Sequence, residues 1–325
     1  MVSVIIPVYN GEEYIQTILN SFMRQKDNDF EIIFVNDGST DDSFNKLNSA
    51  KDNSNLSIIV IDQQNAGVSA ARNAGIKNAR GGLLCFCDVD DDVTDGYISD
   101  MRYVIENNDV ELVICKHKLL QVDGTEVSNS IDQGTGKVII KDSISCLRDY
   151  LYGRMVSGCW TLMVRKELLT KNDLWFAEGY KYSEDLHMVW RLLACSRNVA
   201  YLDKALYIYF LRKNSATSKF DIERLHGHEL MKSLGNFMDK YSPQFTHEYK
   251  KYAASKMMWS ITWQSSILFE FKKFKAFIQK YNVKKDMRNL LTFRNRKIAL
   301  SSAMFLLSPN IFRKMAIRYG KKLTH

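Results

Sequence analysis

Residues 83–92 read Leu83-Leu84-Cys85-Phe86-Cys87-Asp88-Val89-Asp90-Asp91-Asp92. The five apolar residues at the start of this stretch predict a strand buried on both faces, as in a mostly parallel sheet. In open α/β sheets, ligands bind just beyond the carboxyl ends of the strands, and carboxylate oxygens suit Mg²⁺ or Mn²⁺. The stretch therefore predicts a divalent-metal site that holds a diphosphate, provided that the chain bends after Asp88. A solvated acidic turn before Val93-Thr94 is the alternative.

Composition indicates a globular protein of one large domain or two ordinary ones. The chain has 325 residues, of which 46% are hydrophobic and 25% charged, and three prolines. It opens directly into a strand pattern, so we expect no signal peptide, and no apolar run reaches the ~18 residues that span a bilayer. Six cysteines without a CxxC pair predict reduced, core-packed thiols in a cytoplasmic protein.

Charge is distributed unevenly along the chain. Residues 220–325 contain 21 Lys and Arg and 7 Asp and Glu, a net charge of +14, which leaves −6 of the total +8 for residues 1–219. A strongly basic tail points to an anionic partner. No recognised nucleic-acid motif accompanies it, so we expect a membrane surface or an oligomer interface rather than nucleic acid.

Strand and helix patterns alternate along the first part of the chain. Apolar runs predict strands at 2–8, 31–35, 56–61, 83–87, 111–115, 158–164 and 199–210, and helical spacing predicts helices at 12–25, 97–105, 143–152 and 186–194. Residues 116–140 are polar with two Gly-containing turns and predict a hairpin excursion. This order predicts an α/β fold with a mostly parallel sheet flanked by helices over residues 1–219, followed by a helical region over 220–325.

Polar loops follow three of the predicted strands: Pro7-Val8-Tyr9-Asn10, Asn36-Asp37-Gly38-Ser39-Thr40-Asp41 and Asp88-Val89-Asp90-Asp91. A helix opening at Asn65-x-Gly67-x-Ser69-x-Ala71-Arg72-Asn73 and the pair Glu184-Asp185 complete the set. In this order the motifs closely resemble the family 2 glycosyltransferases, inverting enzymes with a Rossmann-like GT-A fold. The resemblance covers roughly residues 1–215 and leaves the basic tail outside it.

The resemblance implies a nucleotide-sugar site. Asp37 is expected to accept the N3–H of uracil, although a turn aspartate bonded to its own backbone is the alternative. Asn36 stands where many relatives carry a second aspartate, which leaves the identity of the base open. Arg72 and Arg212 are expected to contact the diphosphate, and Trp160 is expected to contact the sugar. The full set of residues expected to bind the rest of the nucleotide-sugar is Pro7, Val8, Tyr9, Asn10, Gly67, Arg72, Asp88, Val89, Asp90, Trp160 and Arg212. For Arg72 a salt-bridged role, and for Trp160 a core role, stay open.

The resemblance also implies the catalytic groups. Asp90 is the expected metal ligand, with Asp88 on the ribose or the metal and Asp91 as a competitor, and the cofactor is Mn²⁺ or Mg²⁺. Asp185 is the expected general base, which takes the proton of the acceptor hydroxyl, and Glu184 orients it. The alternative for this pair is an ordinary helix N-terminus.

The expected reaction moves a sugar from a UDP-sugar to a hydroxyl of a saccharide or lipid-linked saccharide in cell-surface polysaccharide synthesis. A sugar-phosphate nucleotidyltransferase would need a Gly-rich Arg/Lys loop after the first strand. A non-enzymatic protein that binds an anionic polymer through the tail is the other alternative. Within the tail, Phe271, Phe274 and Ile278 alternate with Lys272, Lys273 and Lys275, which predicts either a helix on the inner membrane face or a helical subdomain with an aromatic core.

Overall fold

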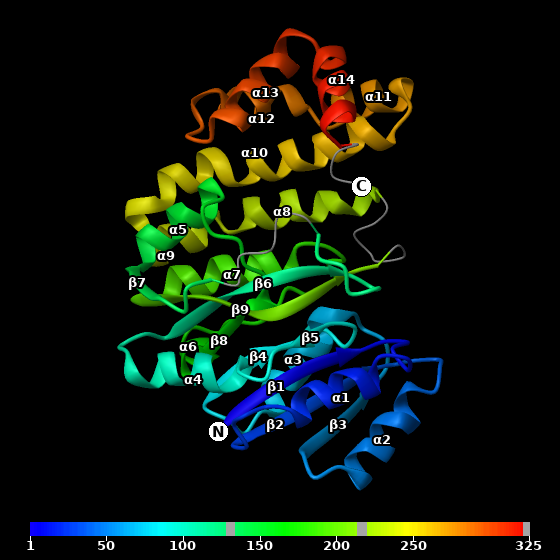
Figure 1. The fold of residues 1–325 in the computed structure, drawn as a ribbon. Helices are drawn as coiled ribbons and strands as arrows, with labels where there is room; N and C mark the ends of the chain where they lie inside the picture. Colours follow the sequence, from blue (N-terminus) through cyan, green and yellow to red (C-terminus); the bar gives the residue numbers. More distant parts are fainter. Residues whose placement is uncertain (128–133, 213–219, 321–325) are drawn as a thin grey trace. The chain divides into compact units, whose positions relative to one another are not determined.

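The computed structural model describes residues 1–127, 134–212 and 220–320 and contains two compact units (Figure 1). The first unit comprises Met1–Cys146, Val156–Tyr180 and Glu184–Ser215. The second comprises Leu147–Met155, Lys181–Ser183 and Ala216–His325.

A nine-stranded sheet forms the centre of the first unit. Its strands are β1 (Val2–Val8), β2 (Phe30–Asp37), β3 (Ser57–Gln63), β4 (Leu83–Phe86), β5 (Asp92–Val93), β6 (Leu112–Gln121), β7 (Val138–Asp142), β8 (Leu162–Arg165) and β9 (Asn198–Leu211). The strand order is β3-β2-β1-β4-β8-β6-β9-β5, and β7 also pairs with β9. The predicted α/β fold is confirmed.

The strands run parallel in β3-β2-β1-β4 and in the β6–β9 pair. β8 runs antiparallel to both of its neighbours, and β5 and β7 run antiparallel to β9. The second half of the sheet is therefore more mixed than the sequence predicts. An apolar run shows that a strand is buried but does not show its direction, which depends on the connection that leads into it.

Helices cover both faces of the parallel half of the sheet. Residues of α1 (Ile15–Met23), α2 (Ser43–Asn53) and α4 (Tyr97–Asn107) share one core with Val2, Val4 and Ile6 of β1. On the other face α3 (Val68–Asn78) lies against β1, where a Cβ on Gly75 would stand 2.3 Å from Ile5 Cγ2. Close contact between helix and sheet at this point therefore requires glycine.

Two local expectations were wrong. Lys116–Gln121, predicted as part of a polar excursion, continues β6 alongside β9, because half-buried positions in a strand accept polar side chains. The polar turn starts later, where Gln121 N–H donates to Thr125 O at 2.9 Å, and residues 128–133 of the excursion lie outside the described part. Residues 159–161, predicted as strand, form a 3₁₀ turn, η1 (Cys159–Thr161), before β8.

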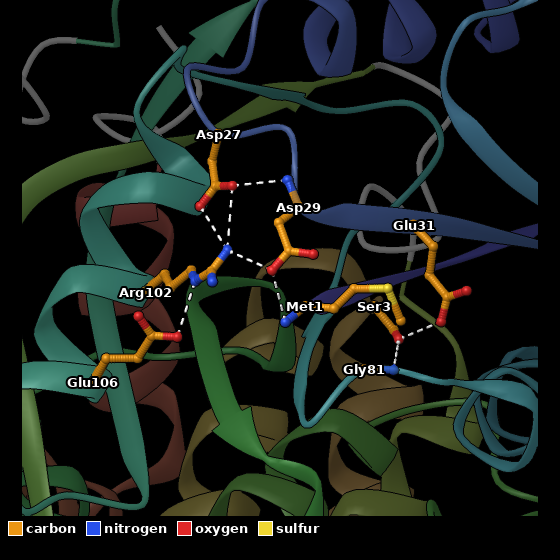
Figure 2. Close-up of polar contacts among 8 residues, drawn as sticks. All are labelled: Met1, Ser3, Asp27, Asp29, Glu31, Gly81, Arg102 and Glu106. Carbon is orange, nitrogen blue, oxygen red and sulfur yellow. Dashed lines mark hydrogen bonds and ion pairs between the residues drawn. The ribbon is translucent and has the colours of Figure 1, made fainter.

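Polar contacts join the starting ends of the parallel strands (Figure 2). Arg102 of α4 lies 3.2 Å from Asp27 and 3.0 Å from Asp29, both of which precede β2. The hydroxyl of Ser3 on β1 donates to Glu31 of β2 at 2.6 Å and accepts the N–H of Gly81, just before β4, at 2.8 Å. These contacts lie at the amino edge of the sheet, opposite the strand exits where ligands of such folds bind.

Helices make up most of the second unit: α8 (Leu225–Ser233), α9 (Gly235–Tyr241), α10 (Pro243–Leu268), α11 (Phe271–Lys280), α12 (Val283–Asn289), α13 (Arg296–Leu307) and α14 (Pro309–Gly320). In α11, Phe274, Phe277 and Ile278 are buried, so the aromatic stripe lies in the core of this unit, which is one of the two alternatives that the sequence left open. Over the described residues, no helix combines the length and the apolar character needed to cross a membrane.

The remaining helices belong wholly or partly to the first unit. They are α5 (Ser143–Tyr152), which continues into the second unit, α6 (Lys166–Lys171) and α7 (Glu184–Cys195). The six cysteines all lie within the described residues, form no disulfide there, and five of them are buried, as expected for core-packed thiols.

Candidate functional site

Strand register brings the polar loops of the first unit to one edge of the sheet. Val8 pairs with Asn36 and Asn36 with Asp62, so β1, β2 and β3 end side by side. Ile5 pairs with Phe86 at the end of β4, which places the acidic loop 87–91 next to the exit of β1. The loops that the sequence singled out therefore share the carboxyl edge, where open α/β sheets bind ligands.

Asp37, at the end of β2, is a buried carboxylate with three donors. Its Oδ1 accepts from Gln63 Nε2 at 2.7 Å and Ala66 N at 2.9 Å, and its Oδ2 accepts from Gly67 N at 2.8 Å. Gly67 has φ +89° and precedes α3 directly, so the loop uses a backbone conformation that favours glycine. Asp37 thus fixes the entry to α3, while base recognition by Asp37 stays a prediction.

The exit of β1 combines buried and exposed residues. Val8 is buried, Pro7 is half-buried and Tyr9 is 54% exposed. Asn10 has φ 49° and accepts the N–H of Thr40 at 2.8 Å, which ties this exit to the loop after β2.

Val89 of the acidic loop packs against the turn that follows Asn10, since a Cβ on Gly11 would lie 3.0 Å from Val89 Cγ1. The loop after β1 therefore contacts both the loop after β2 and the acidic loop. Their side chains line the edge of the sheet at which the nucleotide is predicted to bind.

Asp91 anchors the acidic loop. Asp91 N donates to Asp88 O at 3.2 Å, which is the bend that the sequence required. Its side chain is 2% exposed, and its two oxygens accept from the Tyr207 hydroxyl at 2.7 Å and Phe210 N at 3.1 Å. Burial, followed by the nearby charges of Asp88 and Asp90, raises the pKa of Asp91 to about 8. With both oxygens bonded inside the protein, Asp91 is poorly suited to ligate a metal.

Asp88 and Asp90 differ from Asp91 because each keeps one carboxylate oxygen that has no hydrogen bond or ion pair within the described ranges. Asp88 Oδ1 accepts from Arg72 Nη2 at 2.9 Å, and Asp90 Oδ2 accepts from Arg212 Nε at 3.1 Å. Arg212 also donates to the backbone carbonyl of Asp90 and stacks on Tyr14, with its guanidinium carbon 4.3 Å from the ring centroid. Burial and then the Asp88 charge raise the pKa of Asp90, and Arg212 opposes this shift.

Asp88 and Asp90 offer a partial ligand set for a divalent metal. In the part of the chain that the structure describes, no group of three His, Cys, Asp or Glu side chains is arranged to hold a metal. Mg²⁺, however, is usually held by one or two carboxylates together with substrate phosphates. The free oxygens of Asp88 and Asp90 fit that partial ligand set.

Arg72 of α3 connects the acidic loop to α7. Its Nη2 donates to Asp88 and its Nη1 donates to Glu184 Oε1 at 3.1 Å, while its guanidinium carbon lies 5.2 Å from the centroid of the Phe176 ring. The side chain is almost fully buried, and its Nε has no hydrogen-bond partner within the described residues. The salt-bridged role left open for Arg72 is therefore present, and both terminal nitrogens are occupied.

Glu184 and Asp185 lie in the first turn of α7, which starts two residues earlier than the sequence predicted for this helix. Glu184 is buried against Arg72, and burial with the Asp185 charge raises the pKa of Glu184 to about 7. Asp185 is half-buried, and its Oδ1 accepts the N–H of Leu186 at 2.7 Å. Burial raises the pKa of Asp185, and Arg72 opposes the shift. A carboxylate with a raised pKa is suited to general-base chemistry near neutral pH.

Trp160 of η1 is held in an aromatic cluster. Its ring centroid lies 4.7 Å from His117 in an edge-on contact and 4.8 Å from Tyr207. The packing role left open for Trp160 is therefore present, and contact with a sugar stays a prediction.

Sequence reasoning missed four residues that hold the site: Tyr14, Gln63, Phe176 and Tyr207. Tyr207 lies in a strand whose many tyrosines were visible in the sequence, but no local pattern pairs it with Asp91, 116 residues away.

A profile described as glycosyl transferase family 2 matches residues 3–166. This match covers half of the chain, and the protein belongs to the glycosyl transferase family 2. The matched region contains Asp37, Arg72 and the acidic loop, and it ends before Glu184.

Two bacterial relatives match about two thirds of the chain. The uncharacterized glycosyltransferase EpsJ of Bacillus subtilis is 33% identical over 219 residues, which cover 67% of this chain and 63% of EpsJ. Glycosyltransferase GlyA of Streptococcus pneumoniae is 29% identical over 231 residues, which cover 69% of this chain and 32% of GlyA. The chain thus spans less than two thirds of the length of these relatives.

Solved structures share the fold. TarS 1–349 of S. aureus superposes with a TM-score of 0.70 at 20% identity and covers 99% of this chain and 91% of that one. TarS 1–349 has also been solved with UDP-GlcNAc. The mannosyltransferase PcManGT of Pyrobaculum calidifontis, solved with GDP-Man and Mn²⁺, gives a TM-score of 0.57 at 14% identity over 95% of this chain and 87% of PcManGT. At these identities the similarity establishes the GT-A fold alone.

Proposed function

We propose that the protein is an inverting glycosyltransferase that moves a sugar from a UDP-sugar to a hydroxyl of a saccharide acceptor. The observation that carries this proposal is the double contact of Arg72, at 2.9 Å from Asp88 and 3.1 Å from Glu184. It joins the acidic loop, where a diphosphate would lie, to the start of α7, where Asp185 provides a base. The UDP-GlcNAc complex of TarS supports a UDP-sugar as the donor for a chain of this fold.

Asp185 is proposed as the general base. Inversion at the anomeric carbon needs one carboxylate opposite the leaving nucleotide, where it accepts the proton of the attacking hydroxyl. Asp185 Oδ2 has no hydrogen bond or ion pair in the described part of the chain, so it is free to accept that proton. Glu184, held by Arg72, positions the first turn of α7 and with it Asp185.

A divalent cation, Mg²⁺ or Mn²⁺, is proposed on Asp88 and Asp90. When bound, it would neutralise charge on the departing nucleotide diphosphate. Arg212 holds the side chain and the backbone carbonyl of Asp90 and so fixes the direction of the remaining oxygen. The Mn²⁺ complex of PcManGT supports metal use in this fold.

The two parts of the chain are proposed to have different functions. Residues 1–219 bind the nucleotide-sugar and carry out the transfer, and residues 220–325 form a basic helical region for a membrane surface or a second copy of the chain. We propose a cytoplasmic protein, peripheral at the inner membrane face, which acts on a lipid-linked saccharide in cell-surface polysaccharide synthesis. The glycosyltransferase names of EpsJ and GlyA support a role in sugar transfer. The proposal of a lipid-linked acceptor is based on the positive charge of residues 220–325.

Calorimetric titration of UDP with and without Mn²⁺ tests the nucleotide site. The wild type is expected to bind UDP with Mn²⁺ and much more weakly without it. Asp90→Ala is expected to lose the metal-dependent part, and Asp52→Ala, on the exposed side of α2, is expected to bind like the wild type. If UDP fails to bind while GDP binds, the proposed donor class is wrong. If neither nucleotide binds to the folded wild type, the assignment of the site is wrong.

A further inference from the structure

An exposed apolar stripe runs along the last two helices of the second unit. Leu300 and Leu307 of α13 are 66% and 85% exposed, and Ile311 of α14 is 50% exposed. Leu300, the half-buried Met304 and Leu307 are four and three residues apart, which places them on one face of α13. Ile311 follows four residues later in the first turn of α14, after the extended residue Ser308. We call Leu300, Met304, Leu307 and Ile311 the α13–α14 stripe.

The buried side of α13 contains two serines beside the apolar Ile298 and Phe305. Ser301 and Ser302 are 4% and 0% exposed, and Ser301 accepts a hydrogen bond from Trp259 Nε1 at 2.9 Å. A surface helix normally buries its leucines and exposes its serines. α13 therefore presents large apolar side chains to the surroundings although small polar ones were available in the same helix. Contiguous exposed apolar side chains on a helix mark an interaction surface.

Basic residues continue the stripe at both ends. Arg296 and Lys297 lie one turn before Leu300, and Lys314 and Arg318 lie one and two turns after Ile311; all four are exposed. Residues 287–320 contain seven Lys and Arg and no Asp or Glu. The preceding acidic residue, Asp286, is 9% exposed and accepts a hydrogen bond from Ser255 at 2.9 Å. No carboxylate of this segment opposes the approach of an anionic partner.

We propose that the α13–α14 stripe docks on an anionic lipid surface. Leucine and isoleucine side chains enter the boundary between headgroups and acyl chains, and the lysines and arginines at the ends of the stripe contact the headgroup phosphates. A purely polar anion such as a nucleic acid would leave the exposed leucines in water. An apolar protein surface would leave the four basic side chains without partners. A lipid surface satisfies both parts of the stripe.

This proposal places the membrane contact on α13 and α14 and not on α11, for which the sequence left a membrane-facing helix as one of two alternatives. Phe274 and Phe277 of α11 are 0% and 4% exposed and so are not available to a bilayer without unfolding the core of this unit. The lysines of α11, by contrast, provide a matched comparison, since they add positive charge without exposed apolar side chains.

Sedimentation of the full chain with vesicles tests the proposal. The wild type is expected to bind vesicles of equal parts phosphatidylglycerol and phosphatidylcholine, to bind pure phosphatidylcholine much less, and to be released by salt. The variant Leu300→Ser/Leu307→Ser/Ile311→Ser is expected to lower the vesicle partition coefficient by about tenfold or more, because less apolar surface is buried. The variant Lys272→Glu/Lys273→Glu/Lys275→Glu is expected to change it by less than about threefold, because these lysines lie outside the stripe.

Three results would overturn the proposal. One is wild-type protein that stays in solution with anionic vesicles at low salt. The second is a triple-serine variant that binds as well as the wild type while the α11 variant does not. The third is a wild type that is dimeric in solution and becomes monomeric in the triple-serine variant, which would assign the stripe to a second copy. Circular dichroism reports whether each variant is folded and UDP titration reports the nucleotide site, so failure of the proposed enzymatic function would not be mistaken for failure of this proposal.

Discussion

The hydroxyl of Tyr207 lies between two groups of the acidic loop: it donates to Asp91 Oδ2 at 2.7 Å and accepts the N–H of Asp88 at 3.2 Å. Tyr207 is fully buried in β9, and its ring lies 4.8 Å from that of Trp160. One residue of a late strand thus fixes the backbone from which Asp88 and Asp90 project.

Replacement of Tyr207 by phenylalanine is expected to destabilise the protein. The change leaves the Asp88 N–H and one Asp91 oxygen without their partner at little cost in packing, and a buried unsatisfied polar group costs about 1–3 kcal/mol. Urea denaturation measures the loss. The control is Tyr103→Phe on α4, where the tyrosine is 68% exposed, and a change within about 0.5 kcal/mol is expected there. Equal stability of the two variants would contradict a role for the Tyr207 hydroxyl.

Asp91 predicts how stability depends on pH. Its pKa is raised to about 8 in the folded state from an ordinary value of 3.8, so between these values the folded state binds more protons than the unfolded one. The contribution of Asp91 to the free energy of unfolding is therefore greatest at low pH and is lost as the pH rises toward about 8. Glu184 acts in the same direction, with a pKa of about 7.

Urea denaturation of Asp91→Asn and wild type across this pH range checks the sign. The difference in stability between wild type and variant is expected to shrink as the pH rises. A difference that grows with pH would mean that Asp91 is charged in the folded protein.

Arg72 is expected to be essential for stability as well as for transfer. Arg72→Gln leaves Asp88 and Glu184 without their shared cation, and breaking a buried ion pair from one side costs about 3–5 kcal/mol. Arg72→Lys keeps the charge but not the fork that reaches both carboxylates. We expect it to recover part of the stability and little of the activity.

Thermal unfolding and sugar-transfer rates of both Arg72 variants test these expectations. The exposed Arg80, replaced by glutamine, serves as the control. Full activity in Arg72→Lys would show that charge alone is enough.

Asp185→Asn is expected to abolish transfer while UDP binding is retained. Loss of a general base lowers rates by about 100- to 10,000-fold. Because burial raises the pKa of Asp185, wild-type activity is expected to fall with decreasing pH at a higher pH than for an ordinary aspartate. Steady-state rates across pH measure this effect, with Glu167→Gln, exposed at the start of α6, as the control. Wild-type rates in Asp185→Asn would assign the base elsewhere.

Local patterns in the sequence were enough to predict the strands of the first half of the sheet and the loops that follow them. The apolar runs before Asn10, Asn36 and Asp88 each became a parallel strand, and register then placed the three exits together. The antiparallel direction of β8 and the pairing of Tyr207 with Asp91 depend on contacts between distant parts of the chain. No spacing rule encodes these contacts.

The helical region shows the same limit in a different form. The spacing of Phe274 and Ile278 indicates an apolar face on α11, and that face exists. Spacing alone does not show whether such a face meets the rest of the protein or its surroundings. The apolar residues of 298–307 show the same limit, because their spacing does not indicate that Leu300 and Leu307 are exposed, as the structure shows.

The contacts that β9 makes with the acidic loop bear on the order in which the protein matures. Tyr207 is 116 residues from Asp91, and Arg212 is 122 residues from Asp90. During synthesis, residues 88–91 leave the ribosome long before Tyr207 and Arg212 have been added to the chain. Until then the carboxylates of this loop stay solvated. The backbone pairing of β1 with β2 and β4, by contrast, involves only residues 2–86. The residues that hold the acidic loop in place are therefore synthesised well after the strands that surround it.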